Sequence, residues 1–122
     1  MARDLDKEID ALLPLAPAFL HILIALGDKD RHGYSIMQDV AERTGGQVRM
    51  SPGTLYGSLR KMLDDGLVEE SFRRTSGPRD GDERRRYYRL TKFGRAVAAA
   101  EAERLTALLH HARLNGLVPR KG

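Results

Sequence analysis

The stretch from Ser51 to Gly66 constrains the fold of this chain more than any other segment. Ser51 is a preferred N-cap residue, Pro52 suits the first helical position, and Gly66 is typical of the left-handed residue that ends helices. Between these signals, apolar residues recur at helical spacing, at Leu55, Leu59, Met62 and Leu63. The sequence therefore predicts one helix with a single buried side.

The opposite side of this helix carries more glycine than stability favours. Gly53 and Gly57 point outward, and each costs about 1 kcal/mol relative to alanine, a cost that close approach of a large partner would justify. The outward and flanking residues are Gly53, Thr54, Tyr56, Gly57 and Ser58, followed by Arg60 and Lys61. Short polar side chains at the start of a helix, followed one turn later by basic residues, favour insertion into the DNA major groove. An ordinary solvated face is the open alternative.

Three helices are expected upstream of this segment. Residues 3–13 form a short amphipathic helix, and residues 18–27 are apolar around almost the whole circumference. A third helix spans residues 34–44 and is joined to Ser51 by a connector over residues 47–50. Helix, connector and outward-facing helix follow one another in the order of a helix-turn-helix motif, with a connector longer than the simplest turn.

The hydrophobic period changes after Gly66. Residues 67–74 and 83–90 alternate as β-strands, and the Gly/Pro/Asp-rich residues 75–82 between them predict a turn. A hairpin placed directly after a candidate recognition helix is the wing of a winged helix. The arginines that concentrate positive charge toward its tip are Arg73, Arg74, Arg79, Arg84, Arg85 and Arg86. Crowded like charges repel unless an anion relieves them, which favours a phosphate partner over the alternative of a merely solvated charge run.

A long helix over residues 92–115, capped by Thr91, is predicted next. Its apolar residues exceed what one small core can cover, so we expect it to pair with a second copy of the chain, together with the helix over residues 3–13. The predicted dimer residues are Leu5, Ile9, Leu12, Val97, Leu105, Leu108, Leu109 and Ala112. The tail, residues 116–122, is expected to be disordered.

Composition excludes several classes of protein. A chain of 122 residues has room for one core, and the lack of cysteine excludes disulfides and thiolate metal sites, which favours the cytoplasm. No membrane span or signal peptide is recognisable. The net charge of +4 suits a polyanionic partner. No cofactor is predicted, and no arrangement of nucleophile, base and orienting group indicates an enzyme.

The histidines and paired aspartates give no metal-ligand spacing. His21 lies on an apolar helix, which is typical of a hydrogen-bonded core or interface histidine. His110 and His111 are adjacent and so point in different directions around the last helix. A favourable interaction with the negative, C-terminal end of the helix dipole explains them better than metal binding. Asp80 and Asp82 match the start of a calcium loop whose later ligand positions are missing. We therefore predict no metal site.

Several ordered motifs together resemble the PadR family of transcriptional regulators. They are His32-Gly-Tyr34, Ser51-Pro-Gly-Thr-Leu-Tyr56 continuing to Leu59, Asp65-Gly-Leu67, and Arg85-Arg-Tyr-Tyr-Arg-Leu-Thr91 followed by Gly94. The match runs over about residues 15–109, and the single C-terminal helix resembles the shorter branch of the family. The resemblance implies a winged helix-turn-helix fold, a homodimer, and binding to palindromic promoter DNA as a repressor that a small-molecule effector releases.

The resemblance also assigns roles to individual residues. The implied groove-facing residues are Gly53, Thr54, Tyr56 and Ser58, within the DNA-binding stretch that includes Ser51 and Gly57. The implied backbone contacts are Tyr34, Arg60 and Lys61. The wing arginines would reach phosphate or the adjacent minor groove, and they are Arg79, Arg84, Arg85 and Arg86. An effector near the dimer centre would contact Phe19, His21 and Leu23, for which plain core packing is the alternative.

The predicted layout is mainly α-helical with a small β-hairpin wing. Residues 1–14 form a helix for dimer contact, residues 15–90 a winged helix-turn-helix DNA-binding domain, residues 91–115 a dimerisation helix, and residues 116–122 a disordered tail. The expected partners are double-stranded DNA, a second copy of the chain and a small-molecule effector. The alternative function is a winged-helix module that binds protein without specific DNA binding.

Overall fold

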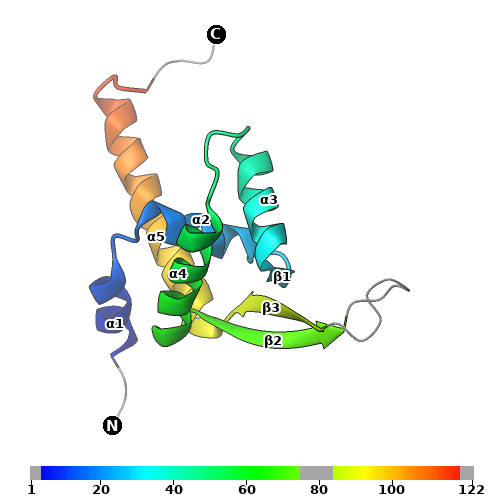
Figure 1. Ribbon diagram of the computed structural model, residues 1–122. Coiled ribbons are helices and arrows are strands. Elements are labelled where there is room, and N and C mark those ends of the chain that lie inside the picture. Colours follow the sequence, from blue (N-terminus) through cyan, green and yellow to red (C-terminus); the bar gives the residue numbers. More distant parts are fainter. Residues whose placement is uncertain (1–3, 75–83, 119–122) are drawn as a thin grey trace.

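Five helices and a three-stranded sheet make up the described part of the chain, residues 4–74 and 84–118 (Figure 1). In this computed structural model, the side chains of residues 72–74, 84 and 85 also lie outside the description. In chain order the elements are α1 (Leu5–Leu12), α2 (Pro17–Ala25), β1 (Arg31–His32), α3 (Gly33–Arg43), α4 (Pro52–Asp64), β2 (Val68–Arg74), β3 (Arg84–Leu90) and α5 (Lys92–Leu114). The predicted fold class, mainly helical with a hairpin wing, is confirmed.

Four of the five described helices begin where a side chain accepts a backbone N–H of the first turn, and α2 begins at Pro17 without such a cap. Ser51 Oγ accepts the amide of Thr54 at 3.1 Å, and Thr91 Oγ1 accepts the amide of Gly94 at 2.9 Å. Just beyond the end of α4, Gly66 has a φ of +76°, a conformation that residues with a Cβ rarely adopt. The predicted boundaries of α4 are therefore confirmed.

The sheet contains a strand that the sequence did not reveal. β1 pairs antiparallel with β3, with His32 opposite Tyr87, and the strand order is β1-β3-β2. Two residues are too few to show an alternating pattern. Arg31 holds this segment in place, because its Nε donates to the carbonyl of Ala25 at 2.7 Å and its Nη1 donates to Ser35 Oγ at 3.1 Å. Arg31 thus ties the end of α2 to the start of α3.

The core forms around α2, which contacts α3, α4 and α5 (Figure 1). The apolar circumference of α2 explains this central position, since most of its sides find a neighbour. The fully buried apolar residues include Ile22, Leu23, Ile36, Val40, Leu55, Leu59, Met62, Leu67 and Val97. No single helix in the described ranges is long and apolar enough to cross a membrane; α1 and α2 meet that test only as a pair, bent by 120° at their junction.

The C-terminal half of α5 projects away from the other elements (Figure 1). Leu105, Leu108 and Leu109 are exposed on it. Val97, which was predicted for the dimer interface, is instead completely buried in the chain's own core. That assignment is wrong because the N-terminal part of α5 packs on α2 and β3. In α1, Leu5 is exposed, whereas Ile9 and Leu12 are partly buried against the same core, and Ala112 of α5 is partly buried.

A buried carboxylate joins α5 to the segment between α1 and α2. Glu101 is only 1% exposed. Its Oε2 accepts hydrogen bonds from the amide of Leu15 at 2.8 Å and from Nη2 of Arg104 at 3.2 Å. The hydrogen bond from Arg104 lowers the pKa of Glu101, against the smaller opposing effect of burial. Sequence pattern gave no sign of this contact, since its two ends lie 86 residues apart.

Replacing Glu101 with glutamine is expected to lower the free energy of unfolding by about 1–2 kcal/mol at pH 7, because charged hydrogen bonds are lost. The pKa of Glu101 is lower in the folded state than in the unfolded state. The contribution of Glu101 to the free energy of unfolding is therefore complete above the unfolded pKa of about 4.3, and it is lost as the pH falls through the folded-state pKa. Urea unfolding of both proteins from pH 7 to pH 3 should show the difference shrinking toward acid. Glu103→Gln, at an exposed site of the same helix, is the control, and a difference independent of pH would contradict the assignment.

Candidate nucleic-acid interface

The exposed side of α4 leaves its backbone accessible. At about 100° per residue, Gly53, Gly57 and Arg60 share one side of the helix, with Thr54 and Tyr56 flanking it, and all are exposed. A Cβ added to Gly57 would meet nothing beyond its own helix within 4 Å, and one added to Gly53 would meet only Ser51 Oγ, at 3.9 Å. The first two turns of α4 can therefore come close to a large partner.

Ser58 does not belong to this surface. It is only 9% exposed, because it lies on the same side of α4 as the core residues Leu55 and Met62, three positions before it and four after it. The groove contact implied for Ser58 is therefore wrong.

Tyr56 connects the exposed side of α4 to the start of α3. Its hydroxyl lies so close to Gly33 that a Cβ at that position would approach the oxygen to 2.3 Å. Tyr34, the next residue of α3, is 61% exposed. His32 caps α3 by accepting the amide of Ser35 at Nδ1, 3.3 Å away. The first turn of α3 and the N-terminal half of α4 thus form one continuous surface.

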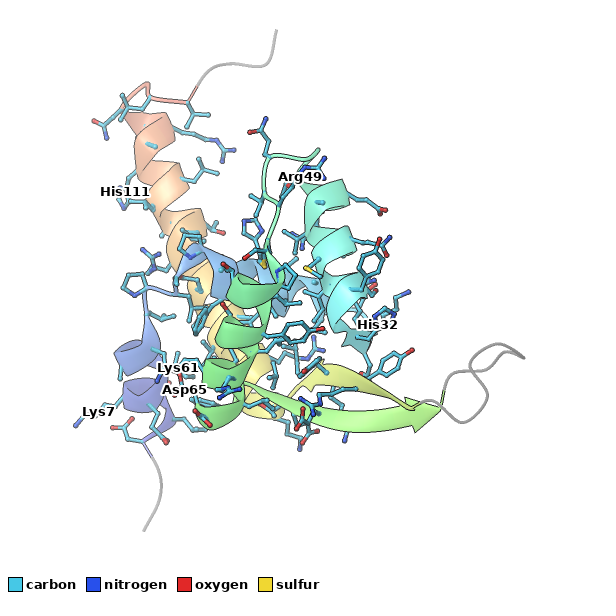
Figure 2. The ribbon with its side chains drawn as sticks, viewed as in Figure 1. Lys7, His32, Arg49, Lys61, Asp65 and His111 are labelled. Carbon is cyan, nitrogen blue, oxygen red and sulfur yellow. The ribbon has the colours of Figure 1, made fainter. Side chains whose placement is uncertain are left out.

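The basic residues of α4 differ in their surroundings. Lys61 is exposed, and its Nζ pairs with Oδ1 of Asp65 at 3.1 Å. Figure 2 shows this pair at the C-terminal end of α4, on the side toward α1, where Asp65 lines a groove with Glu8 and Leu12. Arg60 is exposed on the side of Gly57. Arg60 is therefore the basic residue of α4 that lies on the same side as the exposed glycines.

Arg86 lies in β3 of the wing, opposite Phe72 of β2. Its Nε pairs with Oε2 of Glu70 at 3.2 Å, and its side chain is hydrogen-bonded to Tyr88. That hydrogen bond and the charge of Glu70 raise the pKa of Arg86, so the guanidinium stays positive. Tyr56 of α4 is near enough to act on Arg86 electrostatically. Sequence reasoning found Arg86 but missed its contacts. Alternation along β3 places Tyr88 on the same face, whereas Glu70 of β2 is identified as a neighbour only from the strand register.

The other wing arginines expected to contact DNA are Arg79, Arg84 and Arg85, whose side chains lie outside the description. Arg79 and the aspartates of the calcium-loop alternative, Asp80 and Asp82, lie outside the described residues. Arg84 and Arg85 belong to β3 by their backbone, opposite Arg74 and Arg73 of β2. Their pairing places arginine-rich backbone at the far end of the hairpin, away from the core.

The three residues suggested for effector contact differ in how far they are buried. Leu23 is 1% exposed in the core, so its effector assignment is wrong for the chain described here and the alternative of core packing holds. Phe19 is partly buried against that core. His21 is also partly buried, and its Nδ1 has no hydrogen-bond partner among the described residues, contrary to the expected hydrogen-bonded histidine.

These elements define the class of protein. α3 and α4, joined by residues 44–51, are followed at once by the β2–β3 hairpin, and the short β1 completes the sheet. An outward helix held by a preceding helix and flanked by a wing is a winged helix-turn-helix domain. Proteins of this class place the second helix in a DNA groove.

Comparison with known proteins agrees with this class. Two curated relatives are similar to this chain. The transcriptional regulator Rv3488 of Mycobacterium tuberculosis is 37% identical over 89 residues, and the match covers 73% of this chain and 76% of that protein. An uncharacterised protein of Lysinibacillus sphaericus is 33% identical over 75 residues, and the match covers 62% of this chain and just under two thirds, 65%, of that protein.

Solved structures share the fold. A PadR family transcription regulator from Clostridium difficile aligns with a TM-score of 0.70 and 24% identity over 81% of this chain and 97% of that one. Bacillus subtilis PadR, solved in complex with operator DNA, aligns with a TM-score of 0.60 and 22% identity over 71% of this chain and 47% of that one.

The family is shown by the sequence itself. Residues 22–100, more than half of the chain, match the transcriptional regulator PadR-like family. This chain therefore belongs to the PadR-like family of transcriptional regulators. The resemblance stated from its motifs is confirmed, and the family is one of regulators rather than of enzymes.

Proposed function

We propose that this regulator is a homodimer that binds palindromic promoter DNA sequence-specifically, represses transcription, and is released by a small-molecule effector. One observation carries the DNA-binding part of the proposal: the first two turns of α4 are exposed with glycines at their centre, beside Tyr34 and Arg86. A stable helix gains nothing from exposed glycines, whereas a helix that lies in a groove needs the room.

Each part of this surface has a role in the proposal. Thr54 and Tyr56 meet base edges, and the N-terminus of α4 directs its N–H groups and positive dipole end at phosphate. Tyr34, Arg60, Lys61 and the wing arginines bind the backbone. Phosphate contacts dominate affinity in such complexes, and each one changes the slope of log K against log salt by about 0.9. A cytoplasmic location, where promoter DNA would be bound, is part of the proposal.

The dimer part of the proposal is supported by the exposed leucines of α5. Leu105, Leu108 and Leu109 form an apolar strip that the chain's own core does not cover. Two copies related by a two-fold axis would present their α4 helices to half-sites about 34 Å apart. Repression and effector release are inferred from the resemblance of the motifs to the family, with Phe19 and His21 as the remaining candidates for effector contact.

Selection of tight-binding sequences from a random duplex pool tests the proposal. At moderate salt, enrichment of an inverted repeat with half-sites about one helical turn apart is expected. Retention of DNA without any enriched sequence would contradict sequence-specific recognition. A salt-insensitive complex with a protein, in the absence of duplex binding, would favour the protein-interaction module instead.

Replacing Gly57 with alanine is expected to change stability and binding in opposite directions. The free energy of unfolding should rise by about 1 kcal/mol, because alanine favours the helix and its Cβ has open space. Duplex affinity should fall about tenfold or more, since the methyl group holds the backbone away from the groove. Ala99→Gly on the exposed side of α5 is the converse control, with lower stability and unchanged affinity. Unchanged DNA affinity of Gly57→Ala would remove this face of α4 from the interface.

A further inference from the structure

Arg86 occupies a junction between the wing and the helix proposed to read DNA. In the β2–β3 register Glu70 lies opposite Tyr88, and both share a sheet face with Arg86. This face meets the core, since Tyr88 is buried, and Tyr56 of α4 acts electrostatically on Arg86. Arg86 is therefore a wing arginine within electrostatic range of the exposed side of α4.

Two neighbours hold the Arg86 guanidinium. Glu70 binds its Nε at 3.2 Å, and the hydroxyl of Tyr88 accepts a hydrogen bond from the same side chain. Tyr88 is 2% exposed, so packing fixes its ring. Burial also raises the pKa of Tyr88, which keeps the phenol neutral. A rigid, neutral acceptor on one side and a carboxylate on the other restrict the rotamers of the arginine.

The held guanidinium still faces solvent. The Arg86 side chain is 53% exposed, and arginine has N–H groups on both terminal nitrogens in addition to Nε. An unrestrained arginine loses rotamer entropy when it binds phosphate, and prior immobilisation removes that cost. The contact that Glu70 and Tyr88 make therefore favours binding of an anion at the outer edge of Arg86.

We propose that Tyr88 is a positioning residue which, with Glu70, holds Arg86 at the junction of wing and α4 for contact with a DNA phosphate. This inference rests on the proposed function as a DNA-binding regulator. Tyr88 itself does not reach the DNA, because it is buried. Its effect on affinity passes through Arg86, so it should disappear when Arg86 is removed.

Tyr88→Phe tests this inference without any change of charge. In the full-length protein, affinity for a random-sequence duplex at low salt should fall about 3- to 10-fold, the equivalent of one arginine immobilised on binding. The salt slope should stay at the wild-type value, because the charge of Arg86 remains. Arg86→Ala should lower that slope by about 0.9. In the double variant, Tyr88→Phe should have no further effect.

Tyr87→Phe is the matched control, on the adjacent residue and the opposite sheet face, where the ring contacts His32 edge-on at a centroid distance of 5.5 Å. It should bind like the wild type. Stoichiometric titration gives the active fraction of each variant, so partial unfolding is not counted as weaker binding. Wild-type affinity of Tyr88→Phe, or an equal loss in the Arg86→Ala background, would overturn the positioning role alone. Failure of the wild type to bind any duplex would overturn the proposed function as well.

Discussion

Gly94→Ala is expected to lower the free energy of unfolding by about 3 kcal/mol or more, which is a large share of a small domain's stability. Gly94 is buried in the first turn of α5, and a Cβ there would lie 1.8 Å from the carbonyl oxygen of Leu67. That oxygen belongs to the backbone and already accepts the amide of Thr91 at 3.1 Å. The overlap can be relieved only by moving α5 away from the start of β2.

Thermal unfolding followed by circular dichroism measures this effect, with an expected fall of the midpoint by more than about 10 °C. Gly57→Ala is the control, because the same change on the open side of α4 should raise the midpoint. If the two variants had equal midpoints, the close approach of α5 and β2 would not contribute to stability. The wing would also move, since Thr91 Oγ1 donates to the carbonyl of Gly66 at 2.6 Å and so fixes the end of α4 to the same junction.

Leu108→Asp is expected to give a monomer whose affinity for an inverted repeat is lower by a factor of about 10²–10⁴. Leu108 is 58% exposed on α5 within the chain, so its replacement leaves the core unchanged. In the proposed dimer it would place an unpaired carboxylate in an apolar interface, which is strongly unfavourable. Once the dimer is lost, each half-site is bound separately and the gain from linked binding disappears.

Sedimentation velocity and duplex titration on the same preparations measure both effects. Ala99→Asp adds the same charge to an exposed site of the same helix and should remain dimeric with normal affinity. A Leu108→Asp protein that sediments as a dimer would exclude this strip of α5 from the interface. A monomer with undiminished affinity for the inverted repeat would show that dimerisation does not support recognition.

Local signals were sufficient for most of the fold. Ser51 and Gly66 gave the ends of α4, Thr91 gave the start of α5, and the change to an alternating pattern gave the hairpin. Such signals work because capping and periodicity depend on neighbours within a few positions. The strand β1 was missed for the same reason, since its two residues are held by β3 and by Arg31 contacts to α2 and α3.

The candidate site was predicted less completely than the fold. Its outward residues Gly53, Thr54, Tyr56 and Gly57 were found from helical periodicity and are exposed as expected. Gly33 gave no local signal for its contact with Tyr56, because that contact joins two helices. Glu70 is likewise identified as a neighbour of Arg86 only once the strand register is known.

The sequence by itself determined where the helices and the two strands of the wing lie, and which side of α4 carries its apolar residues. Tertiary structure alone decided how far each apolar or polar side extends. Ser58 and Val97 show the difference: both lie at the edge of a helical face, and both are buried because a neighbouring element covers that edge. Periodicity describes one helix at a time, whereas burial is set by the elements that pack against it.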